Sequence, residues 1–300
     1  MWVPGEVDLG TTRLFVRSWD DDGPLAHGKD DPRPLVVLLH GWPEDGSAWT
    51  AVAPELAAAG LRVVAPDLKG FGRSDAPRRG YDPATLADET SRLVRLLGAR
   101  RAVLVGQDWG GAVALATAFR HPGHLEALVL AATPFRELDL GAAWHVPLLN
   151  VPLVPELAFR LIGATLTGAA LRYAAADADA FDAAAVERYV DAVTRHPHGW
   201  LAYYRTLSRR VILERGRRAV SGIVPLLPAP RTPAPLRVPT TVVWGTADPV
   251  TPVALAARVA DDLGARLVLL EGVGHFVHEE APEAFAREVL AALAPSGASA

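Results

Sequence analysis

Short, continuous runs of apolar residues alternate along the chain with longer stretches in which apolar residues recur at helical spacing. The runs Leu35–Leu39 and Ala102–Val105 are entirely apolar, as expected for strands that are buried on both faces of a sheet. The segments 47–59, 83–97 and 110–120 have the spacing of amphipathic helices. Repeated strand–helix–strand units predict an α/β fold with a mostly parallel sheet flanked by helices.

This alternation stops near Thr133, and the chain as far as about Pro225 shows helical patterns and no convincing strand. It resumes after a proline-rich connector, with strands expected at 241–244 and 267–270 and a closing helix at 282–293. We therefore predict an α/β core and a helical cap inserted after the sixth core strand. The core is predicted to comprise residues 1–134 and 226–300, and the cap residues 135–225.

Composition excludes several classes of protein. Half of the 300 residues are hydrophobic and 21% are charged, which is enough apolar material for a large core and argues against global disorder. The formal net charge of −4 argues against a nucleic-acid partner. The chain has no cysteine, so disulfides, thiolate metal sites and cysteine nucleophiles are excluded.

The sequence also bears on location and membrane contact. Residues 1–8 lack the basic and apolar regions of a signal peptide, and the apolar tract 146–171 is interrupted by prolines, Glu156 and Arg160. We interpret the apolar cap as the lining of a pocket rather than as a membrane contact. The expectation is a cytoplasmic protein with no membrane partner, either a monomer or a homodimer.

Small residues surround Asp108 where a predicted strand meets a predicted helix. Gly106 and Gly110 flank it at the spacing of a nucleophile elbow, in which a tight turn between strand and helix needs small neighbours. Asp108 stands where many hydrolases have serine. Aspartate is also a good helix N-cap, so this segment alone leaves both interpretations open.

Two further residues favour the catalytic interpretation. Asp248 and His275 each follow a predicted strand, so Asp108, Asp248 and His275 have the chain order of nucleophile, acid and histidine. All three fall at the carboxyl ends of strands, where α/β sheets bind ligands. The backbone N–H groups of Trp42, after the first core strand, and of Trp109 are in the positions of an oxyanion hole.

On these motifs the chain resembles α/β-hydrolase-fold enzymes of the epoxide hydrolase and haloalkane dehalogenase group. The resemblance implies that Asp108 forms an ester with a small hydrophobic substrate. His275, oriented by Asp248, then activates a water as co-substrate. No cofactor and no metal are implied. The matching segments are 40–44, 66–75, 106–111, 245–249 and 274–275, and the Asp108–Trp109 pair is typical of the aspartate-nucleophile branch.

The leaving group distinguishes the two activities. Epoxide hydrolases of this group use lid hydroxyls as the acid, and Tyr204 resembles that tyrosine better than Tyr203 does. The first lid tyrosine has no clear match. His145, next to Trp144, either replaces it as a hydrogen-bond donor or only packs in the lid.

A halide instead needs N–H donors, which Trp109 and either Trp144 or Trp200 could supply. Position 42 is tryptophan rather than the asparagine of many dehalogenases, which favours epoxides. A third hypothesis is a ligand-binding protein of the same fold with slow or no turnover.

His40 and Phe276 complete the predicted substrate-binding residues. A metal shared by His275 and His278 is set aside, because His275 is needed as the base.

Overall fold

The computed structural model describes residues 1–20, 22–25, 31–133, 135, 145–215 and 236–293. Eight strands form one sheet in the order β1-β2-β4-β3-β5-β6-β7-β8. Strand β2 pairs antiparallel with β1 and β4, and all the other pairs are parallel, which confirms the predicted α/β fold. The strands are β1 (Val3–Asp8), β2 (Arg13–Ser18), β3 (Leu35–Leu39), β4 (Arg62–Pro66), β5 (Ala102–Gln107), β6 (Leu125–Ala131), β7 (Thr240–Gly245) and β8 (Arg266–Leu270).

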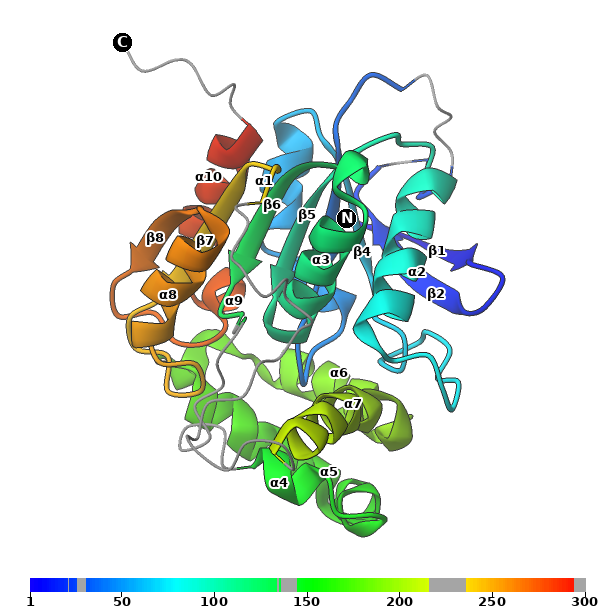
Figure 1. Cartoon of the computed structure of the whole chain (residues 1–300), viewed down its shortest axis with the longest axis vertical. Coiled ribbons are helices and arrows are strands. Elements are labelled where there is room, and N and C mark those ends of the chain that lie inside the picture. The colour runs from blue at the N-terminus through cyan, green and yellow to red at the C-terminus, as the bar shows by residue number, and fades with distance from the viewer. Residues whose placement is uncertain (21, 26–30, 134, 136–144, 216–235, 294–300) are drawn as a thin grey trace.

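Helices cover both faces of this sheet (Figure 1). Helices α2 (Pro83–Leu96), α3 (Asp108–Arg120) and α8 (Ala254–Leu263) contribute to the apolar cluster on one face. Helices α1 (Ala53–Ala58) and α10 (Pro282–Leu293) contribute to the cluster on the other. Three short elements complete the core: η1 (Gly46–Trp49), η2 (Pro122–His124) and α9 (Val277–Glu280).

The central strands are apolar throughout because each of their faces meets a different layer of helices. Every residue of β3 is buried. Leu35, Val37 and Leu39 belong to one apolar cluster, whereas Val36 and Leu38 belong to the other. This is the two-residue period of a strand, applied to a sheet that is covered on both sides.

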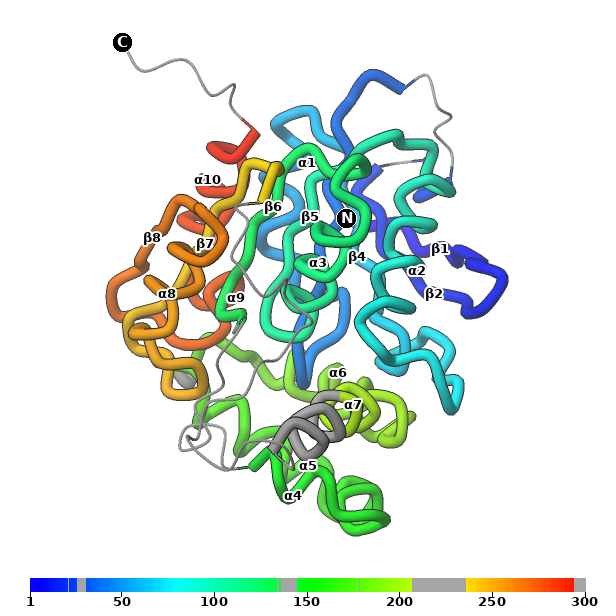
Figure 2. Tube along the Cα trace, in the orientation of Figure 1, coloured from blue at the N-terminus to red at the C-terminus, as the bar shows by residue number. Residues whose placement is uncertain are grey.

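Within the described residues between β6 and β7, four α-helices pack across the carboxyl ends of the strands (Figures 1 and 2). They are α4 (Val146–Leu149), α5 (Val154–Ala174), α6 (Ala183–Thr194) and α7 (Pro197–Arg215), with the short turn η3 (Ala178–Ala180) before α6. We call them the cap helices. The predicted boundaries of the cap fall outside the described residues, so the division of the chain into domains stays a prediction.

Among the hydrogen bonds that tie the cap helices to the core, two join backbone groups. The Gly72 N–H, in the loop after β4, donates to Ala192 O over 3.2 Å. The His275 N–H donates to Ala174 O, at the end of α5, over 3.0 Å. The second bond connects a cap helix directly to the loop that carries His275.

Two elements differ from the sequence prediction. The helix expected over 47–59 is split into η1 and α1, because Pro54 has no N–H to continue a helix and takes a position in the first turn of α1. Strand β1 was not predicted, since its Pro4 and Gly5 are poor strand formers. Its place at the edge of the sheet tolerates them, because an edge strand pairs on one side only.

Candidate active site

Asp108 lies on a sharp turn between β5 and α3. Its φ of +47° is in the left-handed region that aspartate seldom adopts, so the surrounding structure must hold the backbone there. The turn is too tight for side chains on its neighbours. A Cβ on Gly106 would lie 2.5 Å from Gly110 O, and one on Gly110 would lie 2.1 Å from Leu39 O. This packing presents the Asp108 side chain at the carboxyl edge of the sheet.

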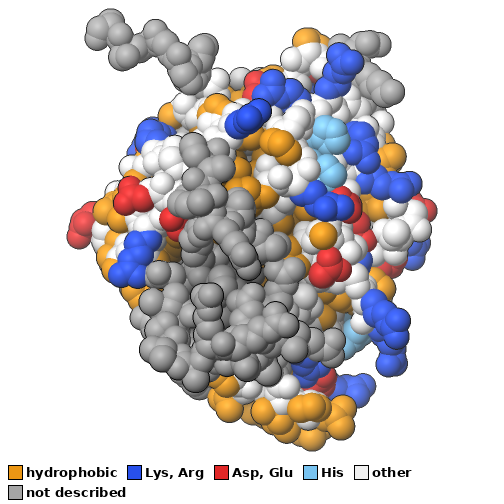
Figure 3. Space-filling model, viewed as in Figure 1, with side chains coloured by type: hydrophobic (Ala, Val, Ile, Leu, Met, Phe, Trp, Pro, Cys, Tyr) orange, Lys and Arg blue, Asp and Glu red, His pale blue; other side chains and the backbone are white. Residues whose placement is uncertain are grey.

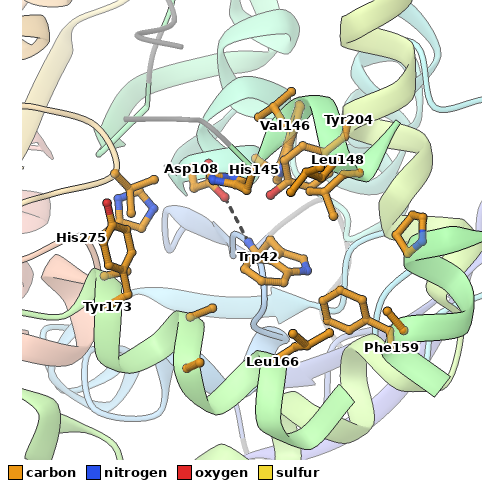
Figure 4. Close-up of a pocket in the computed structure, with 18 of the residues that line it drawn as sticks. Trp42, Asp108, His145, Val146, Leu148, Phe159, Leu166, Tyr173, Tyr204 and His275 are labelled. Atoms are coloured by element: carbon orange, nitrogen blue, oxygen red, sulfur yellow. Dashed lines mark hydrogen bonds between the residues drawn. The ribbon is translucent and has the colours of Figure 1, made fainter. Parts of the chain in front are cut away.

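Backbone N–H groups hold the carboxylate of Asp108. The N–H of Trp42 donates to Oδ2 over 3.1 Å, as the dashed line in Figure 4 shows. Burial raises the pKa of Asp108, while the nearby His275 and hydrogen bonds from the backbone N–H groups of Trp42 and Trp109 oppose that shift. The two predicted oxyanion-hole residues therefore both meet the carboxylate of Asp108.

His275 and Asp248 form a buried pair beside Asp108. His275 Nδ1 lies 2.8 Å from Asp248 Oδ2. Since a carboxylate only accepts hydrogen bonds, Nδ1 carries the proton and Nε2 is left to face a ligand. Burial alone would lower the pKa of His275, but the charge and hydrogen bond of Asp248, together with the charge of Asp108, raise it to about 9.

The loop after β7 fixes the orientation of Asp248. Its Oδ1 accepts the backbone N–H groups of Val250 at 2.8 Å and Thr251 at 2.9 Å. Its Oδ2 accepts the Thr251 hydroxyl at 2.5 Å as well as facing His275. With both oxygens held, Asp248 presents one fixed edge to the imidazole ring.

Tyr204 and His145 line the same cavity as Asp108 and His275 (Figure 4). Burial and the charge of Asp108 raise the pKa of Tyr204, so its hydroxyl keeps its proton at neutral pH. Burial and the neighbouring His275 lower the pKa of His145, so that ring is neutral. Both side chains are therefore hydrogen-bond donors that carry no charge.

The cavity has a volume of about 600 Å³ and a mostly apolar lining. Trp42 and Phe276 contribute aromatic surface from the core, and Phe159 on α5 lies edge-on to the Trp42 ring. Apolar residues of α4 and α5 form most of the remaining wall. A cavity of this size and polarity fits a small hydrophobic ligand with one polar group near Asp108.

Two of the predicted substrate-binding residues do not line the cavity. The Tyr203 hydroxyl donates to Lys69 O over 3.0 Å, within the core. Both ring nitrogens of His40 are engaged, Nδ1 with Gly41 O at 2.8 Å and Nε2 with the Leu68 N–H at 2.9 Å. Neither residue lines the cavity, so the structure does not support their predicted contact with a ligand. Trp144 lies outside the described residues.

Two residues that position the site were missed. Thr251 holds Asp248, and its place three residues after an aspartate is the signal of a local side-chain turn. Gln107 precedes the elbow, and its side-chain N–H donates to His275 O over 3.3 Å. No feature of the sequence indicated this second contact, because the two residues are joined only by the fold.

A cluster of Glu44, His278 and Glu279 offers potential metal ligands within 4.8 Å of one another. His278 Nε2 lies 3.2 Å from Glu44 Oε1, and Tyr189 donates a short hydrogen bond to Glu279. Burial and the charge of Glu44 raise the pKa of Glu279 well above its usual range. A raised pKa disfavours the carboxylate form that a metal ligand needs, and the cluster does not include His275.

Comparisons with known proteins bear on the family and the fold of the chain. The sequence profile of a family described as the alpha/beta hydrolase fold matches residues 34–282. An uncharacterized protein of Mycobacterium tuberculosis is 30% identical over 266 residues, which cover 84% of this chain and 73% of that protein. Epoxide hydrolase B of the same organism is 42% identical over 108 residues, or 35% of this chain and 30% of that protein. The crystal structure of Cfl2 from Burkholderia cenocepacia has a TM-score of 0.77 and 27% identity, covering 96% of this chain and 94% of that chain.

Proposed function

The chain is a hydrolase that belongs to the α/β-hydrolase fold family, and we propose that it opens epoxides to vicinal diols. One observation carries the proposal. An aspartate, not a serine, occupies the strained turn, with one carboxylate oxygen held by the Trp42 N–H and a protonated tyrosine in the same cavity. A carboxylate attacks saturated carbon without first losing a proton, and a tyrosine supplies the proton that an epoxide oxygen needs.

In the first step Oδ1 of Asp108 attacks an epoxide carbon, because Oδ2 is engaged by the Trp42 N–H. The bond between that carbon and the epoxide oxygen breaks, and the oxygen takes the proton of Tyr204. The product is an ester between Asp108 and the substrate. His145 donates a second hydrogen bond to the departing oxygen, which replaces the missing lid tyrosine.

In the second step Nε2 of His275 takes a proton from water, and the resulting hydroxide attacks the ester carbon of Asp108. The negative charge develops on Oδ2, where the backbone N–H groups of Trp42 and Trp109 stabilise it. The ester bond breaks, and the alkoxide takes the proton of the new carboxyl group, which releases the diol. The proton held by His275 returns to Tyr204, so epoxide and water are consumed and the enzyme is restored.

Dehalogenation of a haloalkane is the second candidate, and one feature favours it. The indole Nε1 of Trp42 is buried and has no hydrogen-bond partner among the residues that the structure describes, while the ring lines the cavity. Such an N–H could hold a halide. Against this, the indole N–H of Trp200, a predicted halide donor, donates to Val193 O over 2.9 Å.

Trapping the ester distinguishes the candidates. We expect a His275→Gln variant to form the ester and fail to hydrolyse it. The variant is incubated separately with terminal epoxides and with bromoalkanes, and intact mass and peptide mapping then locate the adduct. A double variant that also carries Asp108→Asn is the control and should remain unlabelled.

Each outcome has a distinct meaning. An adduct on Asp108 with the whole mass of the epoxide supports the proposal. An alkyl adduct without halogen, and none with epoxides, assigns the protein to the dehalogenases. If a folded variant is labelled by neither series, the hypothesis of a ligand-binding protein replaces both enzymatic ones.

A further inference from the structure

Helix α5 exposes apolar side chains to solvent on one side. We call Val154, Leu157 and Leu161 the apolar stripe, since their spacing of three and four residues places them on one face of the helix and all three are exposed. Of the twelve large hydrophobic side chains found exposed among the described residues, eight lie between positions 148 and 173. Figure 3 shows hydrophobic side chains gathered at the lower end of the molecule, where Figure 1 places α4 and α5.

The opposite face of α5 is packed against the rest of the protein. Phe159, Gly163 and Leu171 are buried, and the helix packs against α6 and α7. The helix is long and apolar enough to cross a membrane by length and composition alone, but this packing leaves only one side for another partner. We therefore interpret the apolar stripe as a contact surface and not as part of a membrane-spanning helix.

The exposed apolar surface continues into the cavity. Leu148, Val151, Val154 and Tyr173 are between 42% and 59% exposed, and all four also line the cavity that holds Asp108. An apolar ligand can thus pass from the stripe to the nucleophile along apolar side chains. Val154 belongs to both groups of residues, so the stripe reaches the rim of the cavity.

The charges beside the stripe are positive. Arg160 and Arg172 are exposed on α5. The acidic residue of this helix, Glu156, is neutralised by Arg205, with Oε1 and Oε2 at 2.6 and 3.0 Å from its guanidinium nitrogens. A net positive helix on a chain whose formal charge is −4 suits an anionic partner surface.

We propose that the apolar stripe, with Arg160 and Arg172, docks this protein peripherally onto an anionic lipid bilayer. The bilayer contacts the rim of the cavity and supplies apolar ligands to it without passage through water. This departs from the interpretation of the sequence, in which the apolar cap residues only line a pocket. Docking does not depend on the epoxide chemistry, and it is measured without turnover.

The test is co-sedimentation of the full chain with vesicles of phosphatidylcholine, with and without one quarter phosphatidylglycerol. We expect binding to the anionic vesicles that weakens as salt is added, because salt screens the arginines. The variant Leu157→Glu/Leu161→Glu should lose at least about tenfold in vesicle affinity, since each leucine buries apolar area on docking. Neither leucine lines the cavity, so cleavage of a water-soluble probe should be unchanged.

The matched controls are Leu96→Glu on α2 and Leu269→Glu on β8, which replace leucines that are 43% and 48% exposed outside the cap. The proposal is supported if both controls bind vesicles as tightly as the unaltered protein while Leu157→Glu/Leu161→Glu binds them more weakly. Absence of sedimentation with either vesicle overturns it. The proposal is also overturned if sedimentation velocity shows a dimer of the unaltered protein that Leu157→Glu/Leu161→Glu abolishes. The stripe would then be a contact between two copies of the chain.

Discussion

The backbone N–H of Trp42, in the loop after β3, lies 3.1 Å from Oδ2 of Asp108, which is held at the end of β5. Gly41 makes this approach possible. A Cβ at position 41 would lie 2.2 Å from Gln107 Oε1 and 2.7 Å from Asp108 Cβ. The proposed oxyanion-hole donor and the proposed nucleophile are therefore brought together by a backbone that has no room for a side chain.

We expect Gly41→Ala to reduce turnover of an epoxide by about 100-fold or more, the usual effect of losing one oxyanion donor. The added methyl group would displace either the loop or Asp108, so hydrolysis of the ester should slow. Gly123→Ala is the matched control, because a Cβ there meets nothing within 4 Å. Steady-state kinetics on variants with unchanged thermal unfolding would test this, and a Gly41→Ala enzyme with full activity would contradict the proposed role.

The second step should depend on pH through His275. Its pKa of about 9 in the free protein is raised partly by the charge of Asp108, which the ester removes. The pKa in the ester intermediate should therefore be lower than about 9. Protonated imidazole cannot accept a proton, so hydrolysis of the ester should accelerate as pH rises through that lower pKa and then level off.

Single-turnover kinetics would measure this profile, with Asp248→Asn as the partner variant. Loss of the negative charge should move the profile to lower pH, because the charge of Asp248 raises the pKa of His275. Hydrolysis should also slow by at least about 100-fold, since the ring loses its orientation. A profile that stays in place after this substitution would show that His275 is not the titrating base.

Chelation should leave turnover unchanged, because no step of the proposed reaction uses a metal. Glu44, His278 and Glu279 are close enough to share an ion, but burial raises the pKa of Glu279, and its carboxyl group already accepts the hydrogen bond of Tyr189. Dialysis against EDTA followed by kinetics would check this. Loss of activity that Zn²⁺ restores in the natural sequence, but not in His278→Phe, would instead assign a working metal to the cluster.

Much of the fold follows from local pattern. Helix α6 lies in the part of the chain where the sequence shows helical patterns, and it begins where Asp182 caps it by accepting the Ala185 N–H. Strand β1 could not be predicted in the same way. Its pairing with β2 depends on the fold, and Pro4 and Gly5 argue locally against a strand.

The residues of the candidate site that could be predicted are those indicated by their order along the chain. Asp248 and His275 follow different strands, yet the fold brings His275 Nδ1 and Asp248 Oδ2 to 2.8 Å as their order indicates. The contact of Gln107 with His275 joins residues 168 positions apart and has no local signature. Sequence reasoning therefore placed the charged residues of the site and missed the polar ones that support them.

Tyr203 and Tyr204 are neighbours on α7, and the structure separates their surroundings. Successive residues of a helix point about 100° apart, so Tyr203 and Tyr204 face different surroundings. Tyr204 lines it beside Asp108, whereas the Tyr203 hydroxyl donates to Lys69 O in the core. The sequence favoured Tyr204 by resemblance, and the packing of α7 gives the physical reason.

We expect Tyr204→Phe to slow alkylation of Asp108 by an epoxide about 100-fold or more, because the departing oxygen loses its acid. Alkylation by a bromoalkane should change little, since bromide leaves without a proton. Tyr203→Phe is the matched control and should cost about 1 kcal/mol of unfolding free energy for the lost hydrogen bond, with little effect on alkylation. Pre-steady-state measurement of ester formation with both substrates separates the two tyrosines. Equal slowing of epoxide and bromoalkane by Tyr204→Phe would mean that this residue shapes the cavity and does not donate the proton.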